Sequence, residues 1–442
     1  MTRLLTAVLA CFLSFSGAHA MDIRAVSIPD IGTYWLVEDH TYPMIAVRVA
    51  VREAGSAYDP DGKAGLAALT AGLLNEGAGD MNAEAYQGRL EDLAIDLGFS
   101  TDRDNLIVSL RTLSEHRAEA FRLMGLALSA PRFDPDAVER VRHQMLSLVA
   151  QEEESPSSSA ALRWYARAFA GHPYSSPQNG TRESLKAITR KDLQTFAANH
   201  YARNALVISV VGDVTEEEAT ILIKSAFNAL PFAAASVPVA KVAPTPPAGI
   251  EIIERPIPQS TVIFGHAGIS RNDPDWFAAQ VMNYILGGGG FASRLVNEVR
   301  EKRGLAYSVS SSFNDLAAAD LFVGSVGTKN ERVKESIELI RLEMEKLKAE
   351  GATEEEVVAA KKYLTGSYPL AFASNAQIAG QLLVLQLKGY GPEFVAQRNS
   401  YIEAVTLEDV NRVAARLLRP DQVYWVVVGA PDGLESTVPV AE

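Results

Sequence analysis

Apolar and polar positions alternate along the chain in a way that predicts strands alternating with helices. The runs MIAVRVAVREAG, residues 44–55, and TVIFGHAGIS, residues 261–270, are rich in Val and Ile and favour buried strands. Residues 332–350 instead carry an apolar side chain at every third or fourth position, which predicts an amphipathic helix. Gly351 is a suitable residue to end that helix. The apolar positions of the helix are Val333, Ile337, Ile340, Met344 and Leu347.

The chain contains the same pattern of elements twice. Asp-Pro-Asp at residues 59–61 follows the first strand-like run and precedes an apolar helical run, and Asp-Pro-Asp at residues 273–275 does the same after the second. Residues 189–212 and 406–429 form another matching pair, because each begins with the helix-capping pattern Thr-x-x-Asp and ends with an apolar strand closed by glycine. Two matching pairs in the same order predict an internal duplication.

The duplication predicts an α+β fold made of two homologous α/β sandwich domains, each a sheet with helices on one face. Residues 232–249 separate the halves, and they begin with FAAASVPVAKVAPTPP, whose prolines oppose a helix and favour an extended linker. The first domain is therefore expected to span residues 21–231 and the second residues 250–442. A chain of 442 residues is also long for a single core.

The composition is that of a globular protein, with 48% hydrophobic and 21% charged residues. The formal net charge of −13 argues against a nucleic-acid partner and against an anionic membrane surface. After residue 20, no apolar run reaches the roughly 18 residues that a membrane-spanning helix needs. We therefore expect no nucleic-acid partner and no membrane span in the mature chain.

Residues 1–20, MTRLLTAVLACFLSFSGAHA, have the pattern of a secretory signal peptide. Arg3 precedes an apolar run from Leu4 to Phe15, and Ala18-His19-Ala20 matches the small-residue cleavage site. A buried first helix and a lipoprotein site at Cys11 are the alternatives. Removal of this segment would take away the only cysteine, so the exported chain would contain no disulfide.

The glycine run at residues 287–290 lacks the chemistry of a nucleotide site. A Walker loop requires Lys followed by Ser or Thr, whereas Phe291 and Ala292 follow the glycines here. A dinucleotide-binding loop follows a strand, whereas these glycines follow the helical run WFAAQVMNYIL. The sequence also contains no G-x-S-x-G nucleophile elbow and no two histidines within five residues of each other.

Four stretches of the chain match a known family pattern. The most specific is SRLVNEVREKRGLAYSV, residues 293–309. The others are SAPRFDP (129–135), GHPYSSPQNGTRESLKAITRKDL (171–193) and NALVISVVGDVT (204–215). Together with the duplicated halves, they resemble the pitrilysin/insulinase family of zinc peptidases, in its processing-peptidase-like branch. The resemblance covers nearly the whole mature chain and implies a two-domain fold that is clam-like when paired with a second chain.

Catalytic members of that family carry an inverted zinc motif, H-x-x-E-H, on the first helix of the first domain. By the resemblance, the two His positions fall on Ala68 and Gly72, and the Glu position falls on Ala71. The third ligand, a Glu on a later helix, falls on Leu148. None of these side chains has a lone pair for a metal. Residues 152–154, three nearby glutamates, are interpreted as a solvated acidic turn, so we expect no metal or other cofactor in this chain.

The resemblance also implies that another part of the active site is retained. In the family an Arg and a Tyr of the C-terminal domain reach into the active site, and they correspond here to Arg300 and Tyr307. Both side chains donate hydrogen bonds that can hold a peptide carbonyl and stabilise a developing oxyanion. The alternative is a helix-surface charge at Arg300 and a packed strand residue at Tyr307. Relatives use a glycine-rich loop at this place for substrate, which makes Gly288 and Gly289 candidates for substrate binding.

The resemblance therefore implies a non-catalytic, substrate-binding subunit of an exported, periplasmic heterodimeric zinc metallopeptidase that cleaves peptides. A homologous catalytic subunit bearing H-x-x-E-H would supply the zinc, and this chain, which is not a peptidase alone, would supply Arg300 and Tyr307. The first alternative is a peptide-binding or scaffold protein with no peptidase activity. The second alternative is an independent hydrolase with an unrecognised site.

Overall fold

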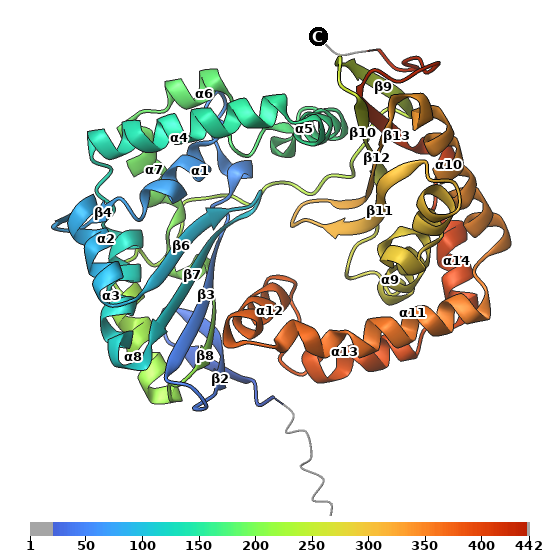
Figure 1. Ribbon diagram of the computed structural model, residues 1–442. Coiled ribbons are helices and arrows are strands. Elements are labelled where there is room, and N and C mark those ends of the chain that lie inside the picture. The colour runs from blue at the N-terminus through green and yellow to red at the C-terminus, as the bar shows by residue number, and fades with distance from the viewer. Residues whose placement is uncertain (1–20, 440–442) are drawn as a thin grey trace, which may run out of the picture.

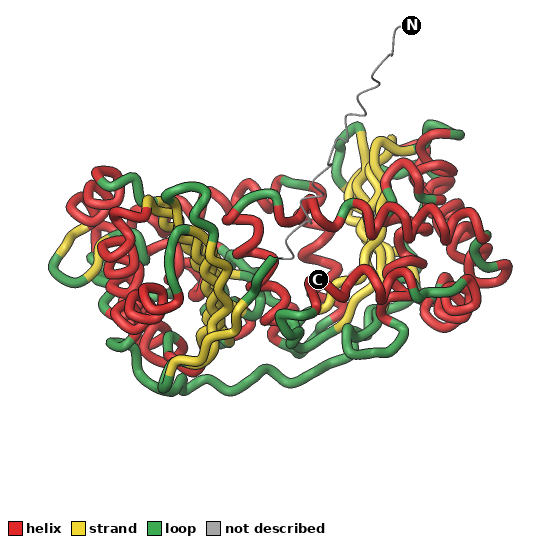
Figure 2. Tube along the Cα trace, turned by 90° about the horizontal axis from the view of Figure 1, so that it is seen from below, coloured by secondary structure: helices red, strands yellow, loops and turns green. Residues whose placement is uncertain are grey.

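The computed structural model describes residues 21–439, so the signal peptide expected at residues 1–20 lies outside the described residues (Figure 1). Each half of the chain is built around its own sheet, and the two sheets form separate layers (Figure 2). Residues 228–248 connect the halves and contain no helix or strand.

The first sheet has six strands in the spatial order β1-β2-β8-β3-β7-β6. Within it β8 pairs antiparallel with β3 and parallel with β2. The strands are β1 Arg24–Ile28, β2 Gly32–Glu38, β3 Met44–Arg52, β6 Asp96–Thr101, β7 Asn105–Leu113 and β8 Leu206–Gly212, beside a small hairpin of β4 Gly77–Ala78 and β5 Met81–Asn82. The helices are α1 Leu66–Leu73, α2 Ala83–Asp92, α3 Arg117–Ser129, α4 Pro135–Glu154, α5 Pro156–Ala168, α6 Arg182–Ala187, α7 Arg190–His200 and α8 Glu216–Phe227.

The second sheet repeats the arrangement of the first. Its order, β9-β13-β10-β12-β11, matches β2-β8-β3-β7-β6 strand for strand, and β13 runs parallel to β9 as β8 does to β2. This match confirms the predicted duplication and the α+β fold class. The strands are β9 Gly249–Glu254, β10 Gln259–Ala267, β11 Ala306–Asp315, β12 Asp320–Lys329 and β13 Tyr424–Gly429. The helices are α9 Trp276–Asn283, α10 Val333–Glu350, α11 Glu354–Gly366, α12 Asn375–Leu387, α13 Phe394–Glu403 and α14 Leu407–Leu417.

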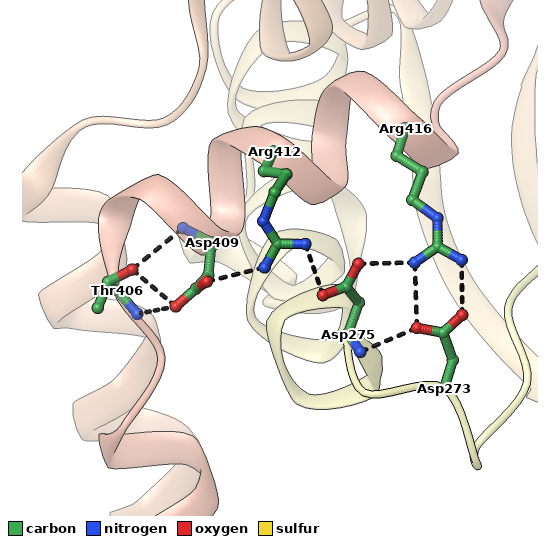
Figure 3. Close-up of polar contacts among 6 residues, drawn as sticks. All are labelled: Asp273, Asp275, Thr406, Asp409, Arg412 and Arg416. Atoms are coloured by element: carbon green, nitrogen blue, oxygen red, sulfur yellow. Dashed lines mark hydrogen bonds and ion pairs between the residues drawn. The ribbon is translucent and has the colours of Figure 1, made fainter.

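The two Thr-x-x-Asp patterns cap helices, as predicted. The Thr189 hydroxyl accepts from the amide of Asp192, and the Asp192 carboxylate accepts from the amide of Thr189, at the start of α7. Thr406 and Asp409 make the same reciprocal pair at the start of α14 (Figure 3). Each pair satisfies amides that have no partner within the helix, so the sequence defines both starting points locally.

The duplication extends to single side chains at the outer strand of each sheet. Asn75, just after α1, donates from its side-chain amide to the carbonyl of Leu97 on β6 at 2.8 Å. Asn283, the last residue of α9, donates in the same way to the carbonyl of Ser311 on β11 at 3.1 Å. In both halves, therefore, the helix that follows Asp-Pro-Asp is attached to an edge strand through an asparagine.

One face of each sheet packs against helices of its own half. In the first half, alternate residues of β3, including Val47, Val49 and Val51, point into a core shared with α1, α3, α7 and α8. In the second half, Val262 and Phe264 of β10 point into a core shared with α9, α10 and α14. These faces match the predicted sandwich of one sheet and one helical layer.

The opposite face of each sheet is covered by a helix from the other half, which the sequence analysis did not predict (Figure 1). Helix α5 of the first half places Trp164 on β10 and β13 of the second sheet. Helix α12 of the second half places Ala379 and Leu382 on β3 and β8 of the first sheet. The expectation of helices on one face only was incomplete, because these strands are apolar on both faces and both faces need cover.

The contact between α5 and the second sheet is close. A side chain at Gly265 of β10 would place its Cβ 2.9 Å from Cζ2 of Trp164 and 2.4 Å from the carbonyl oxygen of Phe322. Glycine is therefore required at this position, because only a bare backbone leaves room for the indole ring.

None of the helices described between residues 21 and 439 is long and apolar enough to cross a membrane by itself. The segment Glu354–Phe372 together with α12 has the length and composition of a membrane span, but the two parts are bent by 117° relative to each other. Since Leu382 of α12 is fully buried in the contact with the first sheet, the apolar side of that helix already has a partner within the molecule.

Replacing Trp164 by alanine tests the exchange of helices. The indole is fully buried between the halves, so we expect Trp164→Ala to lower the free energy of unfolding by about 3–5 kcal/mol, as urea denaturation would measure. Ile221→Ala on the exposed side of α8 is the control and should change it by less than about 0.5 kcal/mol. A loss at Trp164 no larger than in the control would show that the α5 contact is dispensable.

Candidate functional site

The positions that correspond to the zinc ligands lie on α1 and α4, which pack against each other (Figure 1). Ala68 is half-buried, Ala71 is buried and Gly72 is exposed. A Cβ at Gly72 would stand 3.2 Å from Cγ1 of Val141 on α4. Leu148, further along α4, is 41% exposed. These residues provide no oxygen, nitrogen or sulfur side-chain atom, so they do not fit a zinc ion.

The rest of the described chain offers no substitute for these ligands. Between residues 21 and 439 there is no group of three or more His, Cys, Asp or Glu side chains arranged to hold a metal ion. The three glutamates at residues 152–154 end helix α4 rather than forming a separate turn, and two of them have partners. The amide of Asn179 donates to Glu152, and Arg182 forms an ion pair with Glu153 at 2.7 Å.

Arg300 and Tyr307 lie on either side of a turn that leads into the second sheet. Arg300 is in the last turn of a π-helical segment, Val296–Glu301, and Tyr307 is the second residue of β11. Gly304 allows the chain to reverse between them, because its φ is +59°. Tyr307 stands where the pairing of β11 with β12 shifts register, and such a bulge redirects a side chain.

Both side chains are accessible and have free hydrogen-bond donors. The Arg300 side chain is 41% exposed, and its Nε lies 3.6 Å from a carboxylate oxygen of Glu301. Tyr307 is 54% exposed, and its hydroxyl has no hydrogen-bond partner among residues 21–439. Tyr307 therefore does not pack in the core, which was the alternative expected for a strand residue.

Phe291 also belongs to this group, although no motif in the sequence pointed to it. Its ring is 70% exposed, and the guanidinium carbon of Arg300 lies 4.9 Å from the ring centroid. A cation stacked on an aromatic face gains electrostatic attraction while its N–H groups remain available. The sequence gives one signal for this contact, an apolar aromatic residue directly after the glycine run.

The glycine run packs against its own helix and the edge of the sheet. A Cβ at Gly287 would meet the Ser311 amide nitrogen on β11 at 2.8 Å, and one at Gly288 would meet the Asn283 side chain at 2.7 Å. A Cβ at Gly289 would meet the carbonyl oxygen of Tyr284 at 2.6 Å. Close backbone approach thus explains these glycines, and substrate binding by Gly288 and Gly289 stays a prediction.

The start of the stretch SRLVNEV, residues 293–299, has a structural role in this chain, because it anchors the segment that carries Arg300. Ser293 is fully buried and donates to the carbonyl of Gly290 at 2.7 Å. Arg294 forms a two-pronged ion pair with Glu356 of α11, both contacts at 2.7 Å, and also donates to the carbonyl of Gly351. Burial alone would raise the pKa of Glu356, but the Arg294 pairing and the hydrogen bonds from Thr353 together lower it.

The start of α9, from which the glycine run continues, is attached to α14 by four charged residues (Figure 3). Arg416 contacts the carboxylates of Asp273 and Asp275, each at 2.6 Å, and Arg412 contacts Asp275 at 2.6 Å. The Arg416 hydrogen bonds lower the pKa of Asp273. The second Asp-Pro-Asp therefore positions the helix that precedes the site rather than taking part in chemistry.

The predicted site residues fall into two groups in different halves of the molecule. Ala68, Gly72 and Leu148 belong to helices of the first half, whereas Arg300 and Tyr307 belong to the second half.

Between the halves lies a cavity of about 890 Å³. It is lined by the connecting segment at residues 238–244, by residues 315–320 between β11 and β12, and by parts of both sheets.

Two family models match the chain, one in each half. Residues 34–182 match the model for insulinase, peptidase family M16, and residues 187–364 match the model for the peptidase M16 inactive domain. The curated relatives include one from Helicobacter pylori described as "Non-peptidase homolog YmxG", 31% identical over 83% of this chain and 84% of that protein. Another, from Streptomyces coelicolor, is described as "Uncharacterized zinc protease SCO5738" and is 27% identical over 78% of this chain and 76% of its own length.

Solved structures are also similar to this chain over most of its length. A crystal structure of a peptidase M16 inactive domain from Pseudomonas fluorescens superposes with a TM-score of 0.86 at 31% identity, and covers 93% of this chain and 98% of that one. A protease from Helicobacter pylori superposes with a TM-score of 0.84 at 20% identity over 92% of this chain and all of that one, which shows the shared fold. The chain belongs to the insulinase family, peptidase family M16.

Proposed function

We propose that this chain is the non-catalytic, substrate-binding subunit of an exported, periplasmic heterodimeric zinc metallopeptidase that cleaves peptides. The observation that carries the proposal is a contrast between the halves. The three positions of the family's metal ligands, Ala68, Gly72 and Leu148, have no ligand atom, whereas Arg300 and Tyr307 are exposed and have free donors. A homologous partner bearing H-x-x-E-H would provide the zinc and its ligands.

The contribution of this chain would be to bind and orient a peptide. A guanidinium and a phenol can each donate a hydrogen bond to a carbonyl group of an extended peptide. Such donors help catalysis most when their positions are set before the substrate arrives. Here Phe291 supports Arg300, and the bulge in β11 directs Tyr307 outward.

A peptide-binding or scaffold protein without any peptidase activity is the second candidate. It is supported by the description of the Helicobacter pylori relative as a non-peptidase homologue. The two candidates differ in one respect that can be observed, because only the first requires a partner that carries H-x-x-E-H.

Restoring the missing ligands tests whether the zinc positions are assigned correctly. We expect the triple variant Ala68→His/Gly72→His/Leu148→Glu to bind zinc at least about tenfold more tightly than the native chain, because two His one helical turn apart and a neighbouring carboxylate form a zinc site. Metal analysis after dialysis would measure this, with circular dichroism to confirm folding. The double variant without Leu148→Glu is the matched control and should bind less tightly. Equal zinc content in the triple variant and the native chain would refute the assignment.

Replacing the two donors tests the proposed role in catalysis. In the complex with its catalytic partner, Arg300→Ala or Tyr307→Phe should lower peptide turnover by about 10²-fold, because each removes a hydrogen-bond donor near the reacting carbonyl. Assembly of the complex, measured by size-exclusion chromatography, should not change, since both side chains are exposed.

Matched substitutions separate this effect from a general loss of charge or hydroxyl groups. Arg303→Ala removes a nearby exposed arginine that is paired with Glu298, and Tyr42→Phe alters an exposed tyrosine in the first half. Both controls should retain full turnover. Native turnover in Arg300→Ala and in Tyr307→Phe would remove the proposed role of this pair.

A further inference from the structure

The turn between β11 and β12 of the second half is bound by two side chains of the first half. The amide of Ala317 donates to Oδ2 of Asp104 at 3.1 Å, and the amide of Ala318 donates to the hydroxyl of Tyr174 at 3.0 Å. The Tyr174 hydroxyl in turn donates to Oδ1 of Asp104. The connecting segment adds one more contact, because the amide of Val242 donates to the carbonyl of Ala318 at 2.8 Å.

This binding site for the turn is largely buried. Tyr174 is fully buried and Asp104 nearly so. Arg103, also buried, donates to the carbonyl of Tyr174 at 2.8 Å and thereby fixes the segment that carries the tyrosine. Burial raises the pKa of Tyr174, so its hydroxyl keeps the proton that it donates to Asp104. A buried network that is fully satisfied specifies one geometry and is costly to break.

Two carboxylates face each other at the base of the same hairpin, where Asp315 of β11 pairs with Asp320 of β12. Asp315 has strong partners, since Arg271 donates to it at 2.7 Å and the Lys388 ammonium lies 3.1 Å away. Asp320 has no cation within ion-pair distance among residues 21–439, although Lys241 of the connecting segment lies near enough to act on it electrostatically. One carboxylate of the pair is therefore neutralised and the other is not.

The hairpin tip also forms part of the wall of the central cavity. Residues 315–320 line that cavity together with Lys241 and Tyr58, which come from the connecting segment and the first half. If the tip left Asp104 and Tyr174, the cavity would lose this wall and the two halves would lose a polar contact between them.

We propose that the β11–β12 hairpin tip is a latch that holds the halves together across the central cavity, and that the Asp315–Asp320 pair sets how tightly the latch closes. This inference does not depend on the proposed peptidase role. When the latch is closed, Asp320 is partly buried beside a second negative charge. When it is open, Asp320 is solvated and the two carboxylates can move apart.

The direction of the pH effect follows from the two carboxyl groups. Burial, and then the charge of Asp315, raise the pKa of Asp320 from 3.8 to about 6. The closed latch therefore loses stability as the pH rises from about 4 through 6, because the charged form of Asp320 is disfavoured only when the latch is closed. Asp315 acts oppositely. Burial alone would raise its pKa, but Arg271 and Lys388 lower it below 3.8, so its stabilising contribution is present at higher pH and is lost only in stronger acid.

The remaining charged groups near the latch do not reverse this direction. Burial raises the pKa of Asp104 despite its hydrogen bonds, with Asp102 adding to the rise and Lys388 opposing it, so Asp104 also favours closure at lower pH. The cations that face the two carboxylates are Arg271 and Lys388, which contact Asp315, and Lys241, which lies near Asp320. The latch should therefore be tighter near pH 5 than near pH 8.

Hydrogen exchange of the turn amides measures this equilibrium directly. After correction for intrinsic exchange, the opening constant from the amides of Ala317 and Ala318 should fall roughly tenfold between pH 8 and pH 5. The effect of Asp320 is constant above its pKa of about 6, and the one pH unit from there to pH 5 corresponds to a factor of about ten. Asp320→Asn, which removes the charge and keeps the shape, should give at pH 8 at least the protection that the native chain shows at pH 5. Asp421→Asn, an exposed carboxyl group elsewhere in the second half, should behave as the native chain does.

A variant that removes hydrogen bonds without removing a carboxyl group makes the test independent of the titration of Asp320. Tyr174→Phe removes both hydrogen bonds of the hydroxyl and should speed exchange at Ala318 at every pH. If this variant does not fold, the pH series of the native chain and of Asp320→Asn still decides. An opening constant that is unchanged between pH 8 and pH 5, or an Asp320→Asn chain that exchanges like the native one at pH 8, would overturn the proposal.

Discussion

The arrangement of the whole molecule depends on the reciprocal exchange of two helices. Each sheet is apolar on both faces, and the helices of its own half cover only one of them. Helix α5 covers the open face of the second sheet and α12 covers that of the first (Figure 1). Neither half can bury both faces of its sheet alone, so the hydrophobic effect joins the halves into one folding unit. The elements that carry the candidate site are positioned as a consequence of this exchange.

Polar contacts specify which helix covers which sheet. Glu251 of β9 is fully buried, and Arg163 and Arg167 of α5 place their Nε atoms 3.4 and 3.5 Å from its carboxylate oxygens. A buried carboxylate without cations would be costly, so this strand favours α5 over any other apolar helix. On the first sheet, Ser209 of β8 donates to the carbonyl of Ala379 on α12 at 2.6 Å. Apolar packing thus supplies most of the stability, and these contacts supply the register.

The sequence predicted those features that depend on neighbouring residues. The capping patterns at Thr189 and Thr406 are local, and so is the apolar spacing of α10, and all three are confirmed. The exchange of helices was not predictable, because the periodicity of α5 shows that one side is apolar and does not show which sheet it meets. The stacking of Arg300 on Phe291 also depends on a π-helical turn, which has no clear sequence signature. The roles of Arg300 and Tyr307 came from the family resemblance and stay a prediction.

The central claim is that this chain works beside a partner that supplies the metal site it lacks. The most direct measurement is native co-purification: the chain is tagged in its own cells, isolated under gentle conditions, and its bound proteins are identified and quantified by mass spectrometry. We expect a homologous protein bearing H-x-x-E-H in a one-to-one ratio with this chain. Recovery of the chain alone, as a self-associated species, or with a partner that has no zinc ligands would contradict the account and favour a scaffold.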